Sequence, residues 1–275
     1  MEKQNKIVFL LVNYFNEKEV AGFVASELAG QLNEHVCIVI ADNGSQDKKV
    51  LQKIEGTSVK LIEAGTNRGY FGAASLGLQW YLKEKGVHPD AVIICNTDIS
   101  LESTDFIKQL NTYINVNAFD VMGPDIYSTA MNYHQNPYIE SRISGEKIER
   151  YKRVTSNSFL YWMYTLLHLI KTKLVRANKR AGWEKQMNPY AVHGSFMVFN
   201  RSFFEKGGSI NYPSLLFGEE LFVAEQVRKF NMKMVYEPLL VICHHEHTTT
   251  GTFKSKQAVK YLHQSYCYLA DTFFK

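Results

Sequence analysis

The run IVFLLV at residues 7–12, which leads directly into Asn13, determines how the rest of the chain is interpreted. An unbroken stretch of aliphatic and aromatic residues of this length is typical of a β-strand that is buried on both faces. Comparable runs follow at residues 36–41, 59–63 and 91–95, and segments with helical spacing of apolar residues lie between them at 17–32 and 73–85. Strands that alternate with helices in this way predict an α/β fold with a Rossmann-like, mostly parallel central sheet flanked by helices.

Polar residues stand just beyond the ends of these predicted strands. They are Asn13, Asp42, Arg68 and Asp98. Ligands of parallel sheets bind beyond the carboxyl ends of the strands, so we expect these side chains to meet at one edge. Some of them also have a purely structural interpretation, since Asp42 suits a helix-capping turn and Arg68 suits an exposed surface position.

Asp98, in the sequence Asn96-Thr97-Asp98, is a candidate metal ligand. A carboxylate at a strand end suits a hard divalent cation such as Mg²⁺ or Mn²⁺, and such an ion would neutralise a diphosphate. The alternative is that Asp98 caps a helix over residues 100–110. The residue alone does not decide between these two interpretations.

Glu219 and Glu220 follow Gly218 at the start of a predicted helix. Acidic residues are favoured at helix N-termini by the helix dipole, so the pair has a simple structural explanation. The functional alternative is a general base whose proton affinity is raised by the second carboxylate.

Three histidines, His244, His245 and His247, follow a predicted strand at residues 233–242. A single histidine in such a place is usually structural. Three within four residues, close to a proposed metal site, indicate a role beside the ion.

The composition places the chain among ordered globular proteins. With 45% hydrophobic and 21% charged residues it can bury a full core, which excludes a disordered chain and a multi-span membrane protein. The four cysteines are far apart and lack metal-site spacing, and the apolar run near the N-terminus is too short for a secretion signal. We therefore expect a cytoplasmic, reducing environment.

The net charge of +4 is unevenly distributed along the chain. Residues 141–185 contain eleven Lys or Arg and three Glu, a balance of +8, so the remainder carries −4. The basic segment has long aliphatic runs rather than alternating aromatic and basic residues, so we expect no nucleic-acid partner.

Within this segment, residues 156–180 begin with aromatic and aliphatic side chains and end with cations. One interpretation is an interfacial helix that lies on an anionic membrane surface. The other is a helical hairpin that is buried against the body of the protein or in a homodimer interface, because nearly all-round apolarity also suits burial.

Seven sequence elements in a fixed order carry a resemblance to a known family. They are Val12-Asn13-Tyr14, residues 41–45, 67–77 and 96–98, His193-Gly194-Ser195-Phe196-Met197, residues 217–220 and the histidines at 244–247. In these elements the chain resembles glycosyltransferase family 2, the inverting enzymes of GT-A fold, and especially its rhamnosyltransferase-like bacterial members. The resemblance extends from about residue 7 to residue 251 and is weak between 127 and 189.

The resemblance implies a role for each element. Asp42 would hold the nucleotide base, Asn13 and Arg68 would lie near the nucleoside diphosphate, and Asn96 would belong to the same donor site. Asp98 would bind the metal, Mg²⁺ or Mn²⁺, assisted by a histidine, which we assign to His245, with His244 and His247 as alternatives. Glu220, paired with Glu219, would be the catalytic base, and Gly194 would lie beside it.

Two positions depart from the pattern of the family. Asn96 replaces the first Asp of the D-x-D motif and supplies no negative charge, so metal affinity would depend more on the nucleotide. Glu220 replaces the usual Asp and is longer by one methylene group. These departures leave room for a catalytically silent relative.

The resemblance implies a metal-dependent, inverting transfer of a sugar from a nucleotide-diphospho-sugar to a hydroxyl of a glycan or polyprenyl-linked acceptor, in the synthesis of a bacterial surface polysaccharide at the inner face of the plasma membrane. The alternative is a nucleotide-sugar-binding or scaffold protein without catalysis. We expect one GT-A domain, with a donor-binding half at 1–125, a basic, partly helical insertion at 126–189, an acceptor and catalytic-base half at 190–251 and a C-terminal helix at 252–275.

Overall fold

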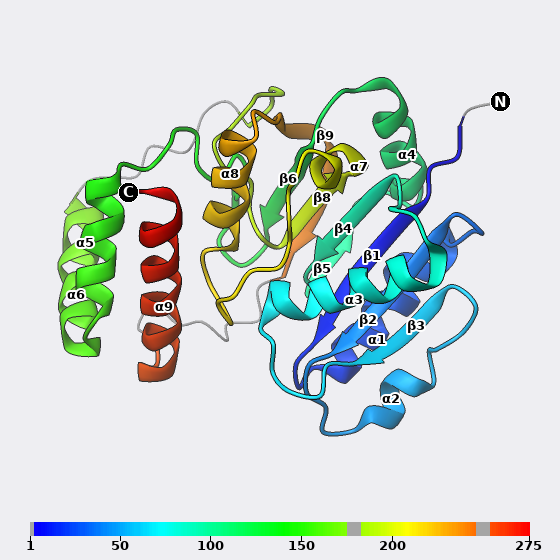
Figure 1. Ribbon diagram of the computed structural model, residues 1–275, viewed down its shortest axis with the longest axis horizontal. Helices are drawn as coiled ribbons and strands as arrows, with labels where there is room; N and C mark the ends of the chain where they lie inside the picture. The colour runs from blue at the N-terminus through cyan, green and yellow to red at the C-terminus, as the bar shows by residue number, and fades with distance from the viewer. Residues whose placement is uncertain (1–2, 175–182, 246–253) are drawn as a thin grey trace.

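The computed structural model describes residues 3–174, 183–245 and 254–275, with side chains up to residue 167 in the first range. A twisted central sheet lies between helices, and three further helices stand side by side at the end of the molecule that holds the C-terminus (Figure 1).

The described strands form one sheet. Its order is β3 (Val59–Glu63), β2 (Val36–Asp42), β1 (Ile7–Asn13), β4 (Ala91–Cys95), β8 (Phe196–Asn200), β6 (Val121–Ser128), β9 (Met234–His244) and β5 (Ile99–Leu101), with β7 (Tyr133–His134) paired to β6. Strands β3, β2, β1 and β4 are parallel, as expected from the alternating pattern. Beyond β4 the sheet is mixed, because β8 runs antiparallel to both of its neighbours.

Strand β1 explains why both faces of this sheet are covered. Its residues 7–11 are at most 1% exposed, and alternate side chains enter two different cores. Phe9 and Leu11 belong to the core that includes helices α1 (Glu17–Phe23) and α4 (Phe106–Val116), whereas Val8 and Leu10 belong to the core that includes α3 (Tyr70–Lys85) and α8 (Glu219–Lys229). Successive side chains of a strand point to opposite faces, and both faces of this strand are covered. Every residue is therefore apolar, which produces the continuous run seen in the sequence.

The helices alternate with these strands. They are α1 (Glu17–Phe23), α2 (Lys48–Gln52), α3 (Tyr70–Lys85), α4 (Phe106–Val116), α5 (Gly145–Thr155), α6 (Ser158–Leu174), α7 (Arg201–Glu205), α8 (Glu219–Lys229) and α9 (Lys256–Phe273). The helical stretch expected from 17 to 32 is α1 followed by a π-helical turn, Val24–Leu28, and a short 3₁₀ turn, Ala29–Gln31.

Two parts of the chain differ from the expectation. Strand β6, which includes Gly123, Pro124 and Asp125, continues to Ser128 and so crosses the boundary expected at residue 125 between the donor-binding half and the insertion. The pairing of β6 with β9 shifts register between Pro124 and Asp125, and such an irregularity accommodates a proline inside a sheet. The helix expected at 100–110 is also wrong, because β5 occupies its start and α4 begins only at Phe106.

A buried ion pair ties the basic insertion to the sheet-covering helix α8. Arg142 Nε donates to Glu225 Oε1 at 2.7 Å, and the Tyr190 hydroxyl donates to the same oxygen at 2.7 Å. Glu225 is fully buried, and Arg228 Nε donates to its other oxygen at 3.0 Å, so two arginines neutralise this carboxylate. From this anchor the chain continues into α5 and α6, which pack with α9 (Figure 1).

Helix α9 closes onto the turn that precedes α8. The hydroxyls of Tyr212 and Ser265 form a hydrogen bond of 2.7 Å, and Gly218 lies directly beneath them with φ +86°. A Cβ atom on Gly218 would overlap Ser265 Oγ and approach the Tyr212 hydroxyl to 2.8 Å. Only glycine therefore permits both the backbone conformation and the close approach of α9.

We predict that Gly218→Ala destabilises the protein much more than Gly86→Ala. Gly86 also has a left-handed backbone, with φ +69°, but an added Cβ there meets no atom within 4 Å. Gly86→Ala should cost about 1–2 kcal/mol from backbone strain alone, and Gly218→Ala should cost several kcal/mol more because α9 must move. Urea denaturation of the two variants measures the difference.

Hydrogen exchange provides the local readout for the same pair. Gly218→Ala should lower protection in α9 around Ser265, whereas Gly86→Ala should leave that helix unchanged. Equal losses of stability in the two variants would show that α9 does not depend on this contact.

Candidate active site

The first two strand ends meet through Asn13. Its side chain is buried and donates to Asp42 Oδ1 at 2.9 Å, to the Gly44 carbonyl at 3.0 Å and to Ser45 Oγ at 3.1 Å. Asn13 and Asp42 are direct neighbours in the parallel register of β1 and β2. Asp42 is not a helix cap, because α2 begins at Lys48 and is capped by Asp47. Asn13 thus orients the Asp42 carboxylate and the turn that follows it.

The next turn is held by two asparagines that the sequence did not single out. Asn43 Oδ1 accepts from the backbone N–H of Arg68 at 2.7 Å, and Asn43 Nδ2 donates to Asn67 Oδ1 at 2.9 Å. The Arg68 guanidinium instead folds back, with Nε donating to the Ala64 carbonyl at 3.1 Å. The structure therefore brings the backbone of Arg68 into the network, while its charged group lies apart.

These strand ends open onto a cavity of about 630 Å³, which we call the donor cavity. Among the residues that line it are Asn43, Asn67, Asn96 and Asp98. Tyr14 and Phe15, which are 51% and 53% exposed, also line this cavity, with their ring centroids 4.7 Å apart.

A hydrogen-bonded group on the same wall fixes the loop that carries Asp98. Thr97 Oγ1 donates to Glu19 Oε1 at 2.6 Å, and Asn16 Nδ2 donates to the same carboxylate oxygen at 2.9 Å. Glu19 belongs to α1, so this contact connects the β4 end to the helix that follows β1. Asp98 itself starts no helix, which removes the capping interpretation.

Asp98 faces His244 across a short gap. His244 Nε2 lies 3.3 Å from Asp98 Oδ1, an oxygen that is buried without a hydrogen bond to the described residues. The other ring nitrogen, Nδ1, lies 2.8 Å from Gln135 Oε1, which is an acceptor and fixes the proton on Nδ1 in the neutral ring. Nε2 and the carboxylate are then two acceptors facing each other, an arrangement that fits a proton or a cation between them.

The ionised form of Asp98 is favoured in this setting. Burial by itself raises the pKa of this carboxyl, but a proton carried on His244 Nε2 in this gap and a hydrogen bond from Asn96 outweigh burial, so the pKa of Asp98 lies below the ordinary value. An anionic carboxylate oxygen is the kind of ligand that Mn²⁺ and Mg²⁺ prefer. Asn96 contributes through its amide to the carboxylate, as well as lining the donor cavity.

His245 lies on the opposite side of the strand end. Its backbone N–H donates to the Asp98 carbonyl at 2.8 Å, while its ring Nε2 is 2.9 Å from Ser100 Oγ. Successive side chains of a strand point to opposite faces, so only one of His244 and His245 can face the Asp98 carboxylate, and that one is His244. His247 lies outside the described residues.

The two glutamates lie where α8 begins. Phe217 and Gly218 immediately before them have φ of +72° and +86°, a sharp turn that brings both carboxyls inward. Glu219 is 6% exposed, and its Oε1 has no hydrogen-bond partner among the described residues. Glu220 Oε1 accepts from the Gly194 N–H at 3.3 Å, and a Cβ on Gly194 would come within 2.8 Å of that oxygen. Gly194 thus allows the approach of Glu220.

Burial raises the pKa of both carboxyls. For Glu219 the pKa rises to about 8, because the group is removed from water and lies beside Glu220. The pKa of Glu220 is raised by burial as well, although backbone N–H groups, including that of Gly194, act in the opposite direction. Acids placed only to complement a helix dipole would be stabilised in the charged form, so the dipole does not explain this pair. Carboxyls that exchange protons near neutral pH suit a general base.

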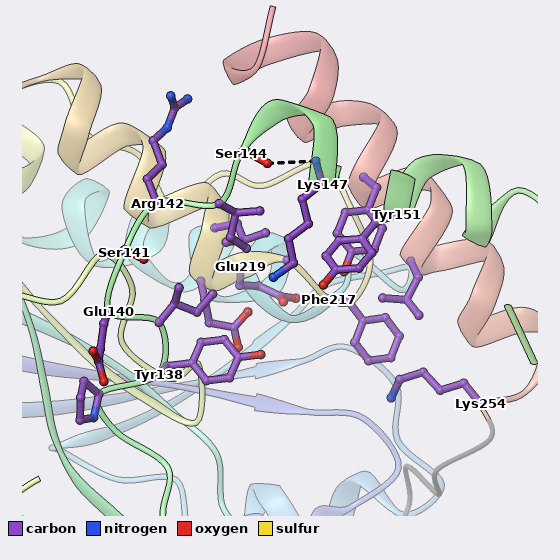
Figure 2. A pocket seen from close by; sticks show the side chains of 18 residues that line it. Tyr138, Glu140, Ser141, Arg142, Ser144, Lys147, Tyr151, Phe217, Glu219 and Lys254 are labelled. Carbon is purple, nitrogen blue, oxygen red and sulfur yellow. Dashed lines mark hydrogen bonds between the residues drawn. The ribbon is translucent and has the colours of Figure 1, made fainter. Parts of the chain in front are cut away.

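A second cavity of about 1100 Å³ is lined by both glutamates, and we call it the acceptor cavity after the acceptor half that the resemblance implies. It is enclosed by residues 137–144, by α5 and α9 and by residues 217–221 (Figure 2). Leu215 and Leu216 line the donor cavity, so the segment 215–220 separates the two cavities. Tyr70 lines the donor cavity, and its buried hydroxyl has a strongly raised pKa, first from burial and then from the charges of Cys95, Glu219 and Asp98.

Known proteins provide an independent comparison. No family model matches the chain. The low-salt glycan biosynthesis hexosyltransferase Agl10 of Haloferax volcanii is 23% identical over 251 residues, which cover 91% of this chain and 70% of that protein.

Three solved structures are similar. A mannosyltransferase from Pyrobaculum calidifontis with GDP-Man and Mn²⁺ has a TM-score of 0.53 at 12% identity. The matched region covers 98% of this chain and 73% of the mannosyltransferase chain. GalNAc-T7 with UDP, GalNAc and Mn²⁺ has a TM-score of 0.56 at 13% identity and covers 90% of this chain. TarS of S. aureus has a TM-score of 0.51 at 11% identity and covers 85%. This chain spans 44% of GalNAc-T7 and 60% of the TarS fragment.

The chain has the GT-A glycosyltransferase fold. The expected resemblance to glycosyltransferases is confirmed by this fold and by the hexosyltransferase relative, whereas the rhamnosyltransferase-like detail stays a prediction.

Several residues of the site were missed from the sequence. The polar ones are Glu19, Asn43, Asn67 and Thr97, and the aromatic ones are Tyr14, Phe15 and Tyr70. Tyr14 and Phe15 directly follow a predicted strand end, so their position was a usable signal. Glu19 gave none, because it lies within a helical pattern and meets Thr97 only in the folded chain.

We predict that Glu219→Gln stabilises the protein at high pH. The folded-state pKa of about 8 lies above the unfolded value of about 4.3, so the folded chain keeps a proton that the unfolded chain has released. Wild-type stability should therefore fall between these two pH values by up to ~1.4 kcal/mol per pH unit from this group. Glu219→Gln removes that fall. The free energy of unfolding of the variant, measured relative to wild type by urea denaturation, should therefore grow from pH 5 to pH 8.5.

Glu146→Gln is the matched control, because Glu146 also lies in the first turn of a helix, α5, but is exposed. It should lower stability slightly at every pH above 5. A pH-independent difference between wild type and Glu219→Gln would contradict the raised proton affinity.

Proposed function

We propose that this protein transfers a hexose from a nucleotide-diphospho-sugar to a hydroxyl group of an acceptor, with inversion at the anomeric carbon. The observation that carries the proposal is the pair of buried Glu219 and partly buried Glu220, which lines one cavity beside a second cavity lined by Asp98. The hexosyltransferase name of the relative supports the activity. The nucleotides in two of the similar structures support the donor class.

The donor cavity would hold the nucleotide sugar. Asn43 and Asn67, which line this cavity, would contact the nucleoside. Asp42, which Asn13 orients, lies beside Asn43 but is not among the lining residues, so its contact with the base stays what the resemblance implies. The diphosphate would lie near Asn96 and Asp98, at the end of β4. This placement follows the general position of ligands at the carboxyl ends of parallel strands.

Asp98 and His244 fit a divalent cation, Mg²⁺ or Mn²⁺, because two acceptors face each other there. The described residues contain no group of three or more potential metal ligands, so the diphosphate would provide the remaining oxygens. When bound, such an ion neutralises the charge that develops on the departing diphosphate. Mn²⁺ in two of the similar structures supports this assignment.

The acceptor hydroxyl would lose its proton to Glu220. Its oxygen forms a bond to the anomeric carbon while the bond from that carbon to the diphosphate oxygen breaks, and attack from the opposite face inverts the configuration. The Gly194 N–H holds one oxygen of Glu220 and thereby orients the base. Burial raises the pKa of Glu220, which favours retention of the proton that it receives.

We predict that Glu220→Gln and Asp98→Ala separate chemistry from binding. Glu220→Gln should lower sugar transfer by about 10²–10⁴-fold, because the base is lost, while Mn²⁺-dependent binding of the nucleotide sugar remains. Asp98→Ala should lose that binding too. Transfer is measured by release of the nucleoside diphosphate from a panel of nucleotide sugars, and binding by the shift in melting temperature.

The exposed Glu146→Gln variant serves again as control and should retain wild-type activity. Wild type that binds nucleotide sugars without turning any over would identify the alternative, a catalytically silent nucleotide-sugar-binding or scaffold protein. Wild-type turnover in both site variants would overturn the assignment of the two residues.

We further propose that α6 contacts a membrane surface, so that a polyprenyl-linked glycan is the acceptor and a surface polysaccharide is the product. Within the described part of the chain, no helix is both long and apolar enough to cross a bilayer. Instead, α6 exposes one apolar face. Its members are Phe159, Leu160, Met163, Leu166 and Leu167, which are 45–64% exposed. The cations at 171–180 that would join this face lie mostly outside the described residues.

We predict that Leu166→Ser with Leu167→Ser lowers sedimentation with anionic vesicles at least tenfold. Each leucine that enters the headgroup boundary contributes about 1.5–3 kcal/mol. Leu239→Ser is the matched control, because Leu239 is 84% exposed on β9, away from α6. A homodimer interface would be favoured instead if the wild-type protein forms dimers and does not bind vesicles, and if the double variant is monomeric.

A further inference from the structure

Two lysines of the acceptor cavity lack an acidic partner among the described residues. Lys147 comes from α5 and Lys254 from the chain just before α9, and both line the cavity (Figure 2). Cations close by are neutralised, since Arg142 pairs with Glu225 and Lys152 with Asp271. The two lysines therefore add positive charge to a cavity that holds the proposed base.

The surroundings of Lys254 limit its contact with water. Its ammonium group lies 4.5 Å from the centroid of the Phe217 ring, in the turn that leads to the glutamates. The residue is partly buried, and burial lowers its pKa, because the charged form loses water without gaining a counter-ion. An anion in the cavity would offset that cost.

Lys147 approaches from the facing wall. Its side chain extends from α5 into the cavity in the direction of Glu219, with Nζ 5.7 Å from the centroid of the Tyr151 ring (Figure 2). No ion pair joins it to either glutamate, and both glutamates have raised rather than lowered pKa values. Its charge is thus left for a ligand.

We propose that the acceptor carries a phosphate group and that Lys147 and Lys254 bind it, a proposal that rests on the proposed function and names its acceptor class. Two ammonium groups from facing walls match the two negative charges of a phosphate monoester or the charge of a diphosphate, whereas a carboxylate offers only one. Lysine binds phosphate as a point charge and tolerates variable geometry. Anchored there, the acceptor would present its hydroxyl to Glu220.

This phosphate is distinct from that of the donor. The donor diphosphate belongs beside Asp98, in the other cavity, and the segment 215–220 lies between the two places. The acceptor phosphate has two chemical sources, a lipid-linked diphosphate or a water-soluble sugar phosphate. The two sources share the same contacts with the lysines.

The test measures binding of inorganic pyrophosphate by calorimetry to the full chain in EDTA, which suppresses a metal-dependent donor site. Wild type should bind, more weakly as salt rises. Lys147→Gln and Lys254→Gln should each weaken binding about tenfold, near 1.4 kcal/mol. The control Lys260→Gln, on the exposed surface of α9 and outside the cavity lining, should bind as wild type does.

Two further probes distinguish the sources. Farnesyl diphosphate that binds more tightly than pyrophosphate, with the same dependence on both lysines, supports a lipid-linked acceptor. Glucose 1-phosphate that binds more tightly, with that dependence, supports a soluble sugar phosphate.

Absence of wild-type binding to all three probes, or unchanged binding in both lysine variants, overturns the proposal. Melting-temperature shifts with nucleotide sugars and Mn²⁺ on the same proteins test the proposed function separately. If the protein binds and turns over the donor but the lysine variants bind the phosphate probes as tightly as wild type, only the acceptor phosphate is rejected. If the wild-type protein does not bind any donor, the proposed function is rejected, while the phosphate probes still show whether the two lysines bind phosphate in this cavity.

Discussion

The site depends on the segment 215–220, which is clamped between two glycine contacts. On one side Gly69 starts α3 with φ +74°, and any Cβ there would overlap the backbone of Leu215. On the other side Gly218 is covered by Ser265 of α9. Because neither glycine leaves room for a side chain, the segment cannot shift toward either cavity without moving α3 or α9. The position of the glutamates is therefore set by elements that are more than 40 residues away on both sides.

The clamp also explains the chemistry of the glutamates. A turn with two consecutive left-handed residues is unfavourable for Phe217, and the packing around it holds it in place. The same packing removes water from Glu219 and Glu220, which raises their proton affinity. A protein that only binds a nucleotide sugar would gain nothing from two buried acids whose ionisation costs stability. The cost is understandable if the pair receives a proton during the reaction.

Much of the donor side could be predicted from the sequence, because buried parallel strands produce continuous apolar runs and place the next polar residue at one edge of the sheet. Asn13, Asp42 and Asp98 were placed at this edge in this way, and their roles stay predictions. Strand β6 could not be, since Gly123, Pro124 and Asp125 interrupt its apolar pattern and only the register shift against β9 accommodates them. The choice between His244 and His245 depends on which face of β9 each side chain occupies, which spacing alone does not reveal. The acceptor cavity joins residues 137–151 to residue 254, a contact that no local pattern encodes.

The replacement of an acid by Asn96 is consistent with this arrangement. Asn96 gives a hydrogen bond to Asp98, which helps to keep that carboxylate ionised beside His244. A second carboxylate at this position would add a like charge next to Asp98 and raise its pKa instead. The chain thus concentrates the negative charge of the β4 end on one carboxylate, opposite one imidazole, and in the proposed function the donor would supply the remaining ligands of a cation. Metal binding and donor binding should then be strongly coupled, because neither the two side chains nor the diphosphate completes the coordination alone.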